Sequence, residues 1–414
     1  MALRRRKSNR RRYRPYRERY VSPKTKWAIA LSVLGVIAIG VLITAFIQGW
    51  ITLPEWPGKD PEQTTVPTEP PEDTVIHIVA GGDVNITDRV VASGGSGYDY
   101  SNMLLDVMPV LAGGDLTLLN FEGNVYGDTY GSTLHAAPPQ LLTALQQCGV
   151  DILQTANSQA ITNGLLGLNA TTAAIRNAGM QPLGTYADQT EFEKYKGFLM
   201  YEVQGVRVAV VAFTKGMDGR NLPEGNEHCV NLLYTDYSST YKQINEDLIT
   251  EILEAVNAEA PDITIAMLHW GSEYNDTKNS TQGKICTLLS ELGVDAIIGS
   301  HPHYVQQMGF DPETGLFVAY SLGDFTGDAE LNGTNYSVLL DLTITKDGST
   351  GKTVVSGFEY VPIYLHYNEA GHLQLLRIRE AIEAYEHNNI IRVPEEVYNA
   401  MKTALTRIES RVNG

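Results

Sequence analysis

The stretch DITIAMLHWG, Asp262 to Gly271, is an almost unbroken apolar run that ends in a histidine and a tryptophan. Such runs are typical of β-strands that are covered on both faces, as in sheets with helices on each side. Six further stretches have the same character: TVIHIVAG (74–81), DLTLLNFE (115–122), GVDILQTAN (149–157), VRVAVVAFT (206–214), VDAIIGSHPH (294–303) and GLFVAYSLGD (315–324). The sequence therefore predicts a core built from many buried strands.

Amphipathic segments separate several of these strands. The predicted helices are Pro139–Cys148, Leu165–Asn177, Tyr241–Ala258 and Gln282–Leu292. Strands that alternate with helices indicate an α/β fold. Residues 336–365 alternate around the turn residues Asp347, Gly348 and Gly351, which predicts a β-hairpin. Residues 374–412 have the pattern of a helical segment, and the chain shows no internal repeat.

The N-terminal part of the chain has the features of a membrane anchor. Its first 26 residues hold twelve Lys or Arg and one acid, Glu18, so 19 basic and 47 acidic residues remain for the rest of the chain. Residues 27–53 contain no charged side chain, and about 20 apolar residues suffice to cross a bilayer. Trp27 and Trp50 stand where interfacial aromatics are expected, and the basic tail predicts a cytoplasmic N-terminus with an outward-facing acidic body. A cleaved signal peptide is the alternative, although the run is long for one and no clear cleavage site follows.

The predicted domain organisation follows from these composition changes. The basic tail is interpreted as a topology signal that contacts anionic lipid, in preference to a nucleic-acid-binding arm. Residues 54–74 are rich in Pro, Glu and Thr and predict an extended stalk. Three cysteines without a CxxC motif argue against a disulfide scaffold and favour buried free thiols. The predicted parts are a tail (1–26), a transmembrane helix (27–53), a stalk (54–74), an α/β body (75–370) and a C-terminal helical segment (371–414).

Polar side chains gather where the predicted strands end. They are Asp83, Asn120, Glu122, Asn157, Gln159, His269, Glu273, His301, His303 and Asp324. In open α/β sheets the binding crevice lies beyond the carboxyl ends of the strands. Carboxylate, amide and imidazole groups without a thiolate fit Mn, Fe, Zn or Mg. Two such ions would hold an anionic oxygen and activate water.

Each of these residues also has a structural interpretation when it is taken alone. Asp83 could be a turn residue after two glycines, Glu122 could cap a loop, and His269 could be a hydrogen-bonded core histidine. The pair His301 and His303 is the strongest indication, because residues two apart in an extended segment point the same way. The whole set is much harder to explain by chance than any one member.

Several motifs, in order along the chain, resemble the CapA-type poly-gamma-glutamate capsule synthesis proteins, whose fold is that of calcineurin-like metallophosphatases. The motifs are GGDV, DLTLLNFEGNV, the stretch from HAAPPQLL to QPLGT, VRVAVVAFT, LHWGSEY, GSHPHYVQQ and YSLGDF, and the match spans about residues 75–365. The resemblance implies a four-layer α/β/β/α sandwich after one transmembrane helix, with two divalent metal ions at one edge. The implied metal ligands are Asp83, Glu122, Asn157, His269, His301 and His303, with Asn157 and His269 also implied as catalytic residues.

The chain departs from the family pattern in its third motif. Ser158 stands where the family has Asn, Gln159 where it has His, Thr162 where Asp usually follows, and Asp324 where it has Asn. Gln can donate a hydrogen bond but cannot transfer a proton at neutral pH. General acid–base help is worth about 10²–10⁴ in rate, so the departures predict metal binding more firmly than turnover. His135 could supply an imidazole from another loop, although an exposed loop histidine is the simpler interpretation. Asn120, Gln159, Glu273 and Asp324 are expected to support the ligands.

The resemblance implies a membrane-anchored, extracytoplasmic bacterial protein for the synthesis, export or anchoring of capsular poly-gamma-glutamate or a related envelope polymer. Membrane-bound synthase or export proteins would be its partners, and no nucleic acid is expected. One alternative is an active metal-dependent hydrolase that acts on a phosphoester or on the polymer. Another is a catalytically degenerate accessory subunit, although an acidic body repels a polyglutamate chain unless bound cations offset its charge. A plain adhesion or stalk domain leaves the clustering of polar residues unexplained.

Overall fold

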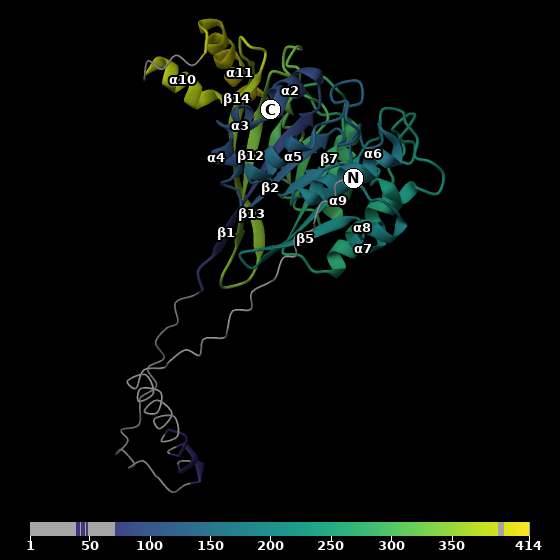
Figure 1. The fold of residues 1–414 in the computed structure, drawn as a ribbon. Helices are drawn as coiled ribbons and strands as arrows, with labels where there is room; N and C mark the ends of the chain where they lie inside the picture. Colours follow the sequence, from purple (N-terminus) through teal and green to yellow (C-terminus); the bar gives the residue numbers. More distant parts are fainter. Residues whose placement is uncertain (1–38, 42, 46, 49–70, 388–392, 414) are drawn as a thin grey trace, which may run out of the picture. The chain divides into compact units, whose positions relative to one another are not determined.

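The computed structural model describes residues 39–41, 43–45, 47–48, 71–387 and 393–413 (Figure 1). The chain divides into two compact units, Met1–Glu69 and Pro70–Gly414, and every strand lies in the second unit. The predicted basic tail, most of the predicted span 27–53 and most of the stalk lie outside the described residues. Within the described ranges, no helix combines the length and the apolar character needed to cross a membrane.

The second unit contains two mixed β-sheets. The first has the order β14-β13-β12-β1-β2-β3-β4, with β11 paired to β1. Its strands are β1 (Thr74–Asn85), β2 (Leu116–Glu122), β3 (Ile152–Gln154), β4 (Gln181–Leu183), β11 (Asp324–Thr326), β12 (Tyr336–Lys346), β13 (Thr353–Tyr367) and β14 (Leu373–Arg377). The second sheet has the order β5-β6-β7-β8-β10-β9. Its strands are β5 (Phe198–Val203), β6 (Val206–Thr214), β7 (Ile263–His269), β8 (Ala296–Ser300), β9 (Met308–Phe310) and β10 (Phe317–Ala319).

Each sheet contains a run of four neighbouring parallel strands, and the site is formed at the carboxyl ends of these two runs. Strands β1, β2, β3 and β4 run parallel in the first sheet, and β6, β7, β8 and β10 do so in the second. The α-helices of this unit are α2 (Asp88–Ala92), α3 (Ser101–Leu104), α4 (Met108–Leu111), α5 (Pro139–Gln147), α6 (Gly164–Asn177), α7 (Gln189–Tyr195), α8 (Glu246–Ala258), α9 (Ser280–Glu291), α10 (Ile378–Glu386) and α11 (Glu395–Asn413). The predicted α/β class is therefore confirmed.

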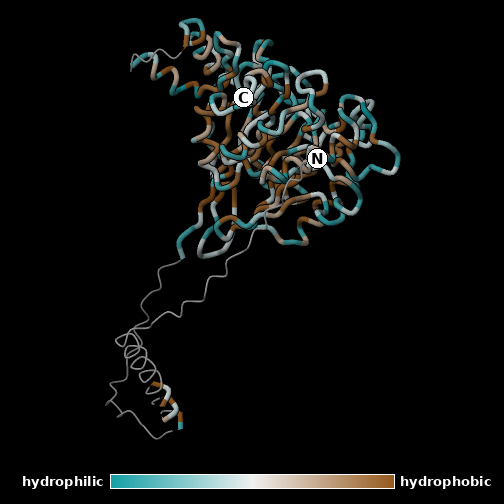
Figure 2. The backbone as a smooth tube through the Cα atoms, in the orientation of Figure 1, coloured by the Kyte–Doolittle hydropathy of each residue, from teal (hydrophilic) through white to brown (hydrophobic). Residues whose placement is uncertain are grey.

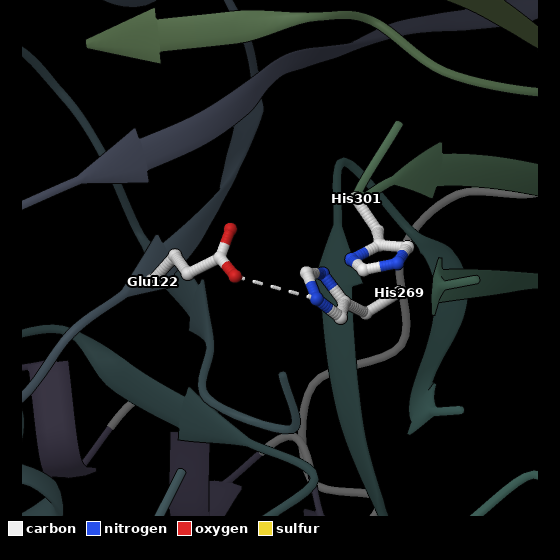
Figure 3. Close-up of side chains that lie close together, drawn as sticks. All are labelled: Glu122, His269 and His301. Carbon is white, nitrogen blue, oxygen red and sulfur yellow. Dashed lines mark ion pairs between the residues drawn. The ribbon is translucent and has the colours of Figure 1, made fainter. Parts of the chain in front are cut away.

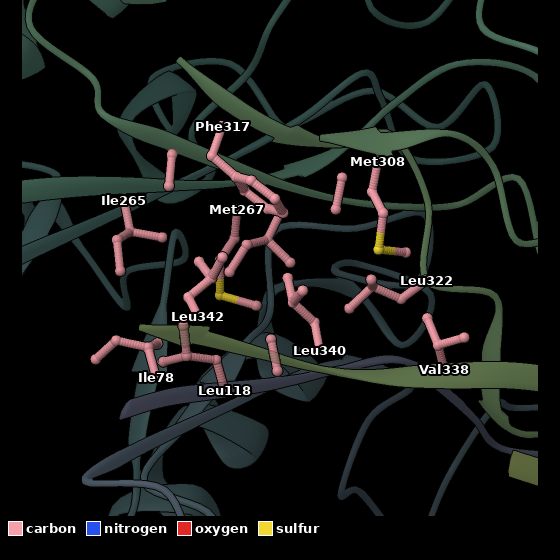
Figure 4. Close-up of a cluster of buried hydrophobic side chains, with 14 of the residues drawn as sticks. Ile78, Leu118, Ile265, Met267, Met308, Phe317, Leu322, Val338, Leu340 and Leu342 are labelled. Carbon is pink, nitrogen blue, oxygen red and sulfur yellow. The ribbon is translucent and has the colours of Figure 1, made fainter. Parts of the chain in front are cut away.

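The apolar runs are buried on both faces, as their composition predicts. Along β7, Ile265 and Met267 belong to a core that also contains Ile78 and Leu118 of the first sheet, so this core lies between the sheets (Figure 4). The alternate residue Leu268 packs with α8 and α9 on the other face of the second sheet. Apolar side chains of α5 and α6 pack in the same way on the outer face of the first sheet. Figure 2 shows the apolar residues concentrated along the interior strands and the hydrophilic residues on the outer loops.

Four aspartates fix the register at the amino ends of parallel strands. Each precedes a strand, and its carboxylate accepts a hydrogen bond from a backbone N–H of the neighbouring strand. The pairs are Asp115 with His77 at 2.8 Å, Asp151 with Thr117 at 2.8 Å, Asp262 with Arg207 at 2.7 Å and Asp295 with Thr264 at 2.8 Å. Because register is set at one end of each sheet, the side chains at the opposite, carboxyl ends are brought into alignment.

Two predicted segments differ from the structure. The helix expected from Tyr241 begins at Glu246, because Ile244 forms a β-bridge with Tyr234 and Tyr241 itself has a φ of 53°. The expectation of a C-terminal segment that is helical throughout is wrong for β14, which pairs with β13 at the edge of the first sheet. Leu373 and Leu375 are buried there, whereas Gln374 between them is partly exposed. The predicted hairpin at 336–365 is confirmed as β12 and β13.

Candidate metal centre

The carboxyl ends of strands from both sheets meet at one edge of the sandwich. In the first sheet, the register places Asp83 beside Asn120 of β2 and beside Asp324 of β11. This close approach of β1 and β11 requires a glycine, because a Cβ on Gly82 would lie 1.7 Å from the carbonyl oxygen of Gly323. In the second sheet, His269 ends β7. The fold thus gathers side chains that are far apart in the sequence.

Two groups of ligand-type atoms lie at this edge. The first consists of Glu122, His269 and His301, and the second consists of Asp83, Glu122 and His303. Within each group the candidate ligand atoms all lie within 4.8 Å of one another. Figure 3 shows the Glu122 carboxylate directed at His269, with Oε1 3.5 Å from Nε2, and His301 on the far side of that ring. Among the described residues, Glu122 is the member that the two groups share, so its carboxylate is placed to join two cation positions.

The two histidines of the HPH motif reach the site through an unusual backbone. His301 has a φ of 93° and His303 a φ of 59°, a region that residues other than glycine seldom adopt. The turn is held by the backbone N–H of His301, which donates to Asp83 Oδ2 at 3.1 Å, and by the N–H of Tyr274, which donates to Pro302 O at 2.9 Å. Backbone strain of this kind costs about 1–3 kcal/mol and persists where surrounding contacts impose it.

The residues of the site fit a divalent cation. Glu122 Oε2 and His301 Nδ1 are buried, and neither has a hydrogen-bond partner among the described residues. An unpaired buried polar atom is costly, so these two atoms indicate that a further group belongs here. Burial also lowers the pKa of His269 and His301 well below the ordinary value, which keeps both imidazoles neutral. Neutral imidazole and carboxylate oxygen are the forms in which these side chains bind metal.

Further polar residues hold the candidate ligands in place. Asn120 donates from Nδ2 to Asp83 Oδ1 at 2.6 Å, and Asp324 Oδ1 lies 2.7 Å from His303 Nδ1. Asn85 donates to the same Asp324 oxygen at 2.9 Å. Burial opposes the charging of His303, but the carboxylates of Asp324, Glu122 and Asp83 raise its pKa well above the ordinary value. Second-layer partners of this type fix the orientation of metal ligands.

Asn157 lies beside the site, but its side-chain amide is already hydrogen-bonded to other groups of the protein. Its amide nitrogen donates to Asn120 Oδ1 at 3.0 Å and to Phe121 O at 2.7 Å. Its oxygen accepts from the backbone N–H of Gln159 at 3.0 Å. The structure therefore shows Asn157 positioning Asn120, and its roles as a ligand and as a catalytic residue stay predictions. Ser158 approaches the first ligand group more directly, with Oγ 3.0 Å from His269 Nε2.

Gln159 and Glu273 line an open cavity next to the ligand groups. The cavity has a volume of about 420 Å³, and Glu122, His303 and Asp324 also border it. Gln159 donates from Nε2 to Asp218 Oδ2 at 3.1 Å. Glu273 lines this cavity and a neighbouring one of about 280 Å³. The two cavities lead from the surface to the carboxylates and imidazoles of the site.

Sequence reasoning missed Lys215, which borders the smaller cavity. Its Nζ donates to Gly271 O at 2.9 Å, lies 3.3 Å from His301 Nε2 and stands 4.7 Å from the ring centroid of Tyr241. Of the described residues that line the two cavities, Lys215 is the only Lys or Arg. It directly follows β6, so applying the strand-end rule to VRVAVVAFT would have found it.

Asp83→Asn is expected to change how the stability of the metal-free protein depends on pH. Burial raises the pKa of Asp83 from 3.8 to about 6, although His303 opposes the shift. Between these values the native state binds more protons than the unfolded state, so stability falls as pH rises through that window. Asn carries no proton to lose, and the variant should gain in stability relative to wild type from pH 4 to pH 6.

Urea unfolding in the presence of a chelator, repeated across this pH range, measures the difference. Asp128→Asn is the control, because Asp128 is exposed. Parallel pH profiles for wild type and Asp83→Asn would show that Asp83 ionises normally in the folded protein.

Comparison with known proteins assigns the chain to a family. The family model for the bacterial capsule synthesis protein PGA_cap matches residues 77–329. The PGA biosynthesis protein CapA of Bacillus subtilis (strain 168) is 26% identical over 268 residues, which are 63% of this chain and 64% of that protein. The capsule biosynthesis protein CapA of Bacillus anthracis is 26% identical over 269 residues, which are 63% of this chain and 61% of that protein. The chain thus matches less than two thirds of the length of either relative.

Among solved structures, the calcineurin-like phosphoesterase YfkN from Bacillus subtilis is similar to 83% of this chain and 100% of its own, with 16% identity and a TM-score of 0.39. A hypothetical protein from Thermus thermophilus is similar to 69% of this chain and 98% of its own, with 14% identity and a TM-score of 0.42. The family model covers well over half of the chain and spans the candidate ligands from Asp83 to His303. The chain therefore belongs to the bacterial capsule synthesis protein PGA_cap family.

Proposed function

We propose that this protein acts in the synthesis, export or anchoring of capsular poly-gamma-glutamate or a related cell-envelope polymer, through a metallophosphatase-type body that binds two divalent cations. One observation carries the metal part: two ligand groups share the buried Glu122. The polymer part is supported by the relatives, which are described as PGA and capsule biosynthesis proteins. Mn, Fe, Zn and Mg all suit the donor set.

The side chains of the site have separable tasks in this proposal. Bound cations would hold an anionic oxygen and lower the pKa of water. His269 and His301 supply neutral nitrogen donors, and Glu122 supplies negative charge to both positions. Asn120 and Asp324 keep Asp83 and His303 in their orientations. Because these supports are short hydrogen bonds within the protein, the site is organised before a cation arrives.

The charged residues that line the two cavities affect how an anionic polymer could bind. The larger cavity is lined by six acidic residues and by no Lys or Arg among the described residues. The six are Glu122, Asp218, Glu273, Asp324, Asp328 and Glu330. A polyglutamate chain would be repelled by this wall unless cations were bound. Lys215 at the smaller cavity offers a positive group for one polymer carboxylate beside the metal positions.

Metal content and polymer binding test the proposal together. The purified full-length chain should contain two equivalents of a divalent metal by elemental analysis, and it should bind poly-gamma-glutamate only while the metal is present. Asp128→Asn serves as a control, because Asp128 is exposed and lines neither cavity of the site. Absence of metal after purification and reloading would contradict the metal part, and metal-independent binding would contradict the role of the site.

A single-pass anchor with an outward-facing body is part of the same proposal. It is supported by the uncharged run 27–53 between a basic tail and an acidic body. Membrane-bound synthase or export proteins are the proposed partners. The protein should stay in the membrane fraction after alkaline extraction, and protease added to cells without their wall should digest the body. If the body were protected from the protease, it would lie on the cytoplasmic side of the membrane, which contradicts this part of the proposal.

An active metal-dependent hydrolase is the second candidate function. It is favoured by the open cavity of about 420 Å³ that gives water and substrate access to Glu122 and His303. An accessory role without turnover is favoured by Gln159, which lines that cavity and whose amide cannot transfer a proton. Whether another group can carry the proton therefore separates these two functions.

A further inference from the structure

Two loops on the cavity wall are tied together by asparagine side chains. One loop contains His135 and the other contains Gln159. Asn124 donates from its backbone N–H to His135 O at 2.7 Å and from Nδ2 to Gln159 O at 3.1 Å. Asn163 donates from Nδ2 to Leu134 O at 2.8 Å and to Asn124 Oδ1 at 2.9 Å. Because the backbone of both loops is held by the same pair of amides, His135 has a fixed position relative to Gln159.

His135 lines the cavity, and its imidazole has no structural task that the described residues reveal. His135 lines the same cavity as Glu122, Gln159, Asp218 and His303, and it is half-buried. No hydrogen bond from its ring to another described residue is formed, whereas the ring of His303 is bound to Asp324. Its φ of 44° lies in the left-handed region, so the contacts of its loop impose this backbone conformation.

Three neighbouring groups on this wall are less suited to moving a proton. His303 is held by Asp324 and belongs to a ligand group, as does Glu122. Gln159 is an amide whose nitrogen is engaged by Asp218. Burial lowers the pKa of His135 below its ordinary value, while Asp218 opposes the shift. The ring is therefore neutral near pH 7 and can both accept and donate a proton.

We propose that His135 is a catalytic residue of this site, which contacts the substrate and carries a proton during hydrolysis. This inference rests on the second candidate function. In the step, the oxygen of water bonds to the phosphorus or carbonyl carbon of the substrate, and the bond to the leaving oxygen or nitrogen breaks with its electron pair. One proton of the water passes to the His135 ring and from there to the leaving atom. Water is thus divided between the two products, and the imidazole returns to its starting state.

His135→Gln tests the proton transfer. With the full-length, metal-loaded protein and either a phosphodiester or poly-gamma-glutamate as substrate, kcat should fall by about 10²–10⁴ while metal content stays unchanged. His366→Gln is the matched control, because His366 is a partly buried histidine whose pKa burial also lowers, and it lies outside both cavities of the site. A His135→Gln protein that retains wild-type kcat would overturn the proposal.

A relocated histidine distinguishes chemistry from structure. In the double variant His135→Gln with Gln159→His, an imidazole returns to the same cavity from the neighbouring loop, and part of the lost rate should return. A merely structural His135 would not be rescued in this way. No rescue, together with a destabilised single variant, would assign His135 a structural role and overturn the proposal.

A measurement without turnover separates failure of this inference from failure of the hydrolytic function. In metal-loaded protein with labelled histidine, the ring signal missing from His135→Gln should shift when inorganic phosphate is added. No shift at a phosphate concentration that calorimetry shows to be saturating would overturn the contact. If the wild-type protein cleaves neither substrate, the hydrolytic function and the proton transfer both fail. The ring signal then decides whether His135 contacts the bound anion.

Discussion

Glu122→Gln is expected to remove both divalent cations from the protein at once. Glu122 is the member shared by the two ligand groups, and its carboxylate is buried with Oε2 unpaired among the described residues. A cation that binds only the folded state at 100 times its Kd adds about 2.7 kcal/mol of stability. The variant should lose this metal-dependent stabilisation. In the metal-free protein the substitution should change stability little, because burial already raises the pKa of Glu122 and favours its neutral form.

Elemental analysis and thermal unfolding, each with and without added metal, measure this effect. Glu273→Gln is the control, because Glu273 lines the cavity but belongs to neither ligand group. It should keep both equivalents of metal and the metal-dependent rise in Tm. If Glu122→Gln retains one equivalent at wild-type affinity, the two positions are independent and Glu122 does not join them.

Most of the candidate ligands that the structure groups could be anticipated from the sequence, because strand ends are well defined. A buried parallel strand is a short apolar run, and the first polar residue after it must lie at the edge of the sheet. Asp83, Glu122, His269, His301 and His303 all follow such runs, and the structure brings these five residues together. Neither apolar pattern nor spacing shows which strands are neighbours, so the grouping around Glu122 could be seen only in the fold.

Residues on loops could not be placed in the same way. Asn157 ends an apolar run like the others, but its side chain turns to Asn120 and to the backbone of Phe121. His135 lies on a loop whose course depends on hydrogen bonds from Asn124 and Asn163, which no local pattern encodes. The simpler expectation of an exposed loop histidine is wrong, since His135 is half-buried against the cavity.

The C-terminal strand β14 was not predicted from the sequence for a different reason. Residues 373–377, LQLLR, contain leucines at spacings that suit either a strand or the start of an amphipathic helix, and the helices α10 and α11 follow. The free edge of β13 decides the outcome, because pairing satisfies its backbone N–H and C=O groups. Pairing with β13, which precedes β14 in the sequence, therefore overrides the local pattern.

Trp270→Ala is expected to cost about 3–5 kcal/mol of folding stability, the range for removing a large buried aromatic side chain. Trp270 is fully buried and stacks on Tyr320, with ring centroids 5.7 Å apart and planes 9° from parallel. Its indole Nε1 donates to Tyr320 O at 2.9 Å, so the substitution also leaves this carbonyl without that donor. Because Trp270 directly follows His269, the cavity left behind should loosen the first ligand group and weaken metal binding as well.

Urea unfolding of the metal-free protein measures the stability loss, and metal titration of the folded variant measures the effect on the site. Trp270→Phe is the matched variant: it keeps an aromatic ring for stacking but loses the indole donor, so its loss should be smaller than that of Trp270→Ala. The order wild type, Phe, Ala should hold for both stability and metal affinity if the indole supports His269. A loss below about 1 kcal/mol for Trp270→Ala would mean that neighbouring side chains fill the space, contrary to the limited relaxation of packed interiors. Unchanged metal affinity beside a large stability loss would instead show that His269 is held by Ser158 and Ser300 without help from the tryptophan.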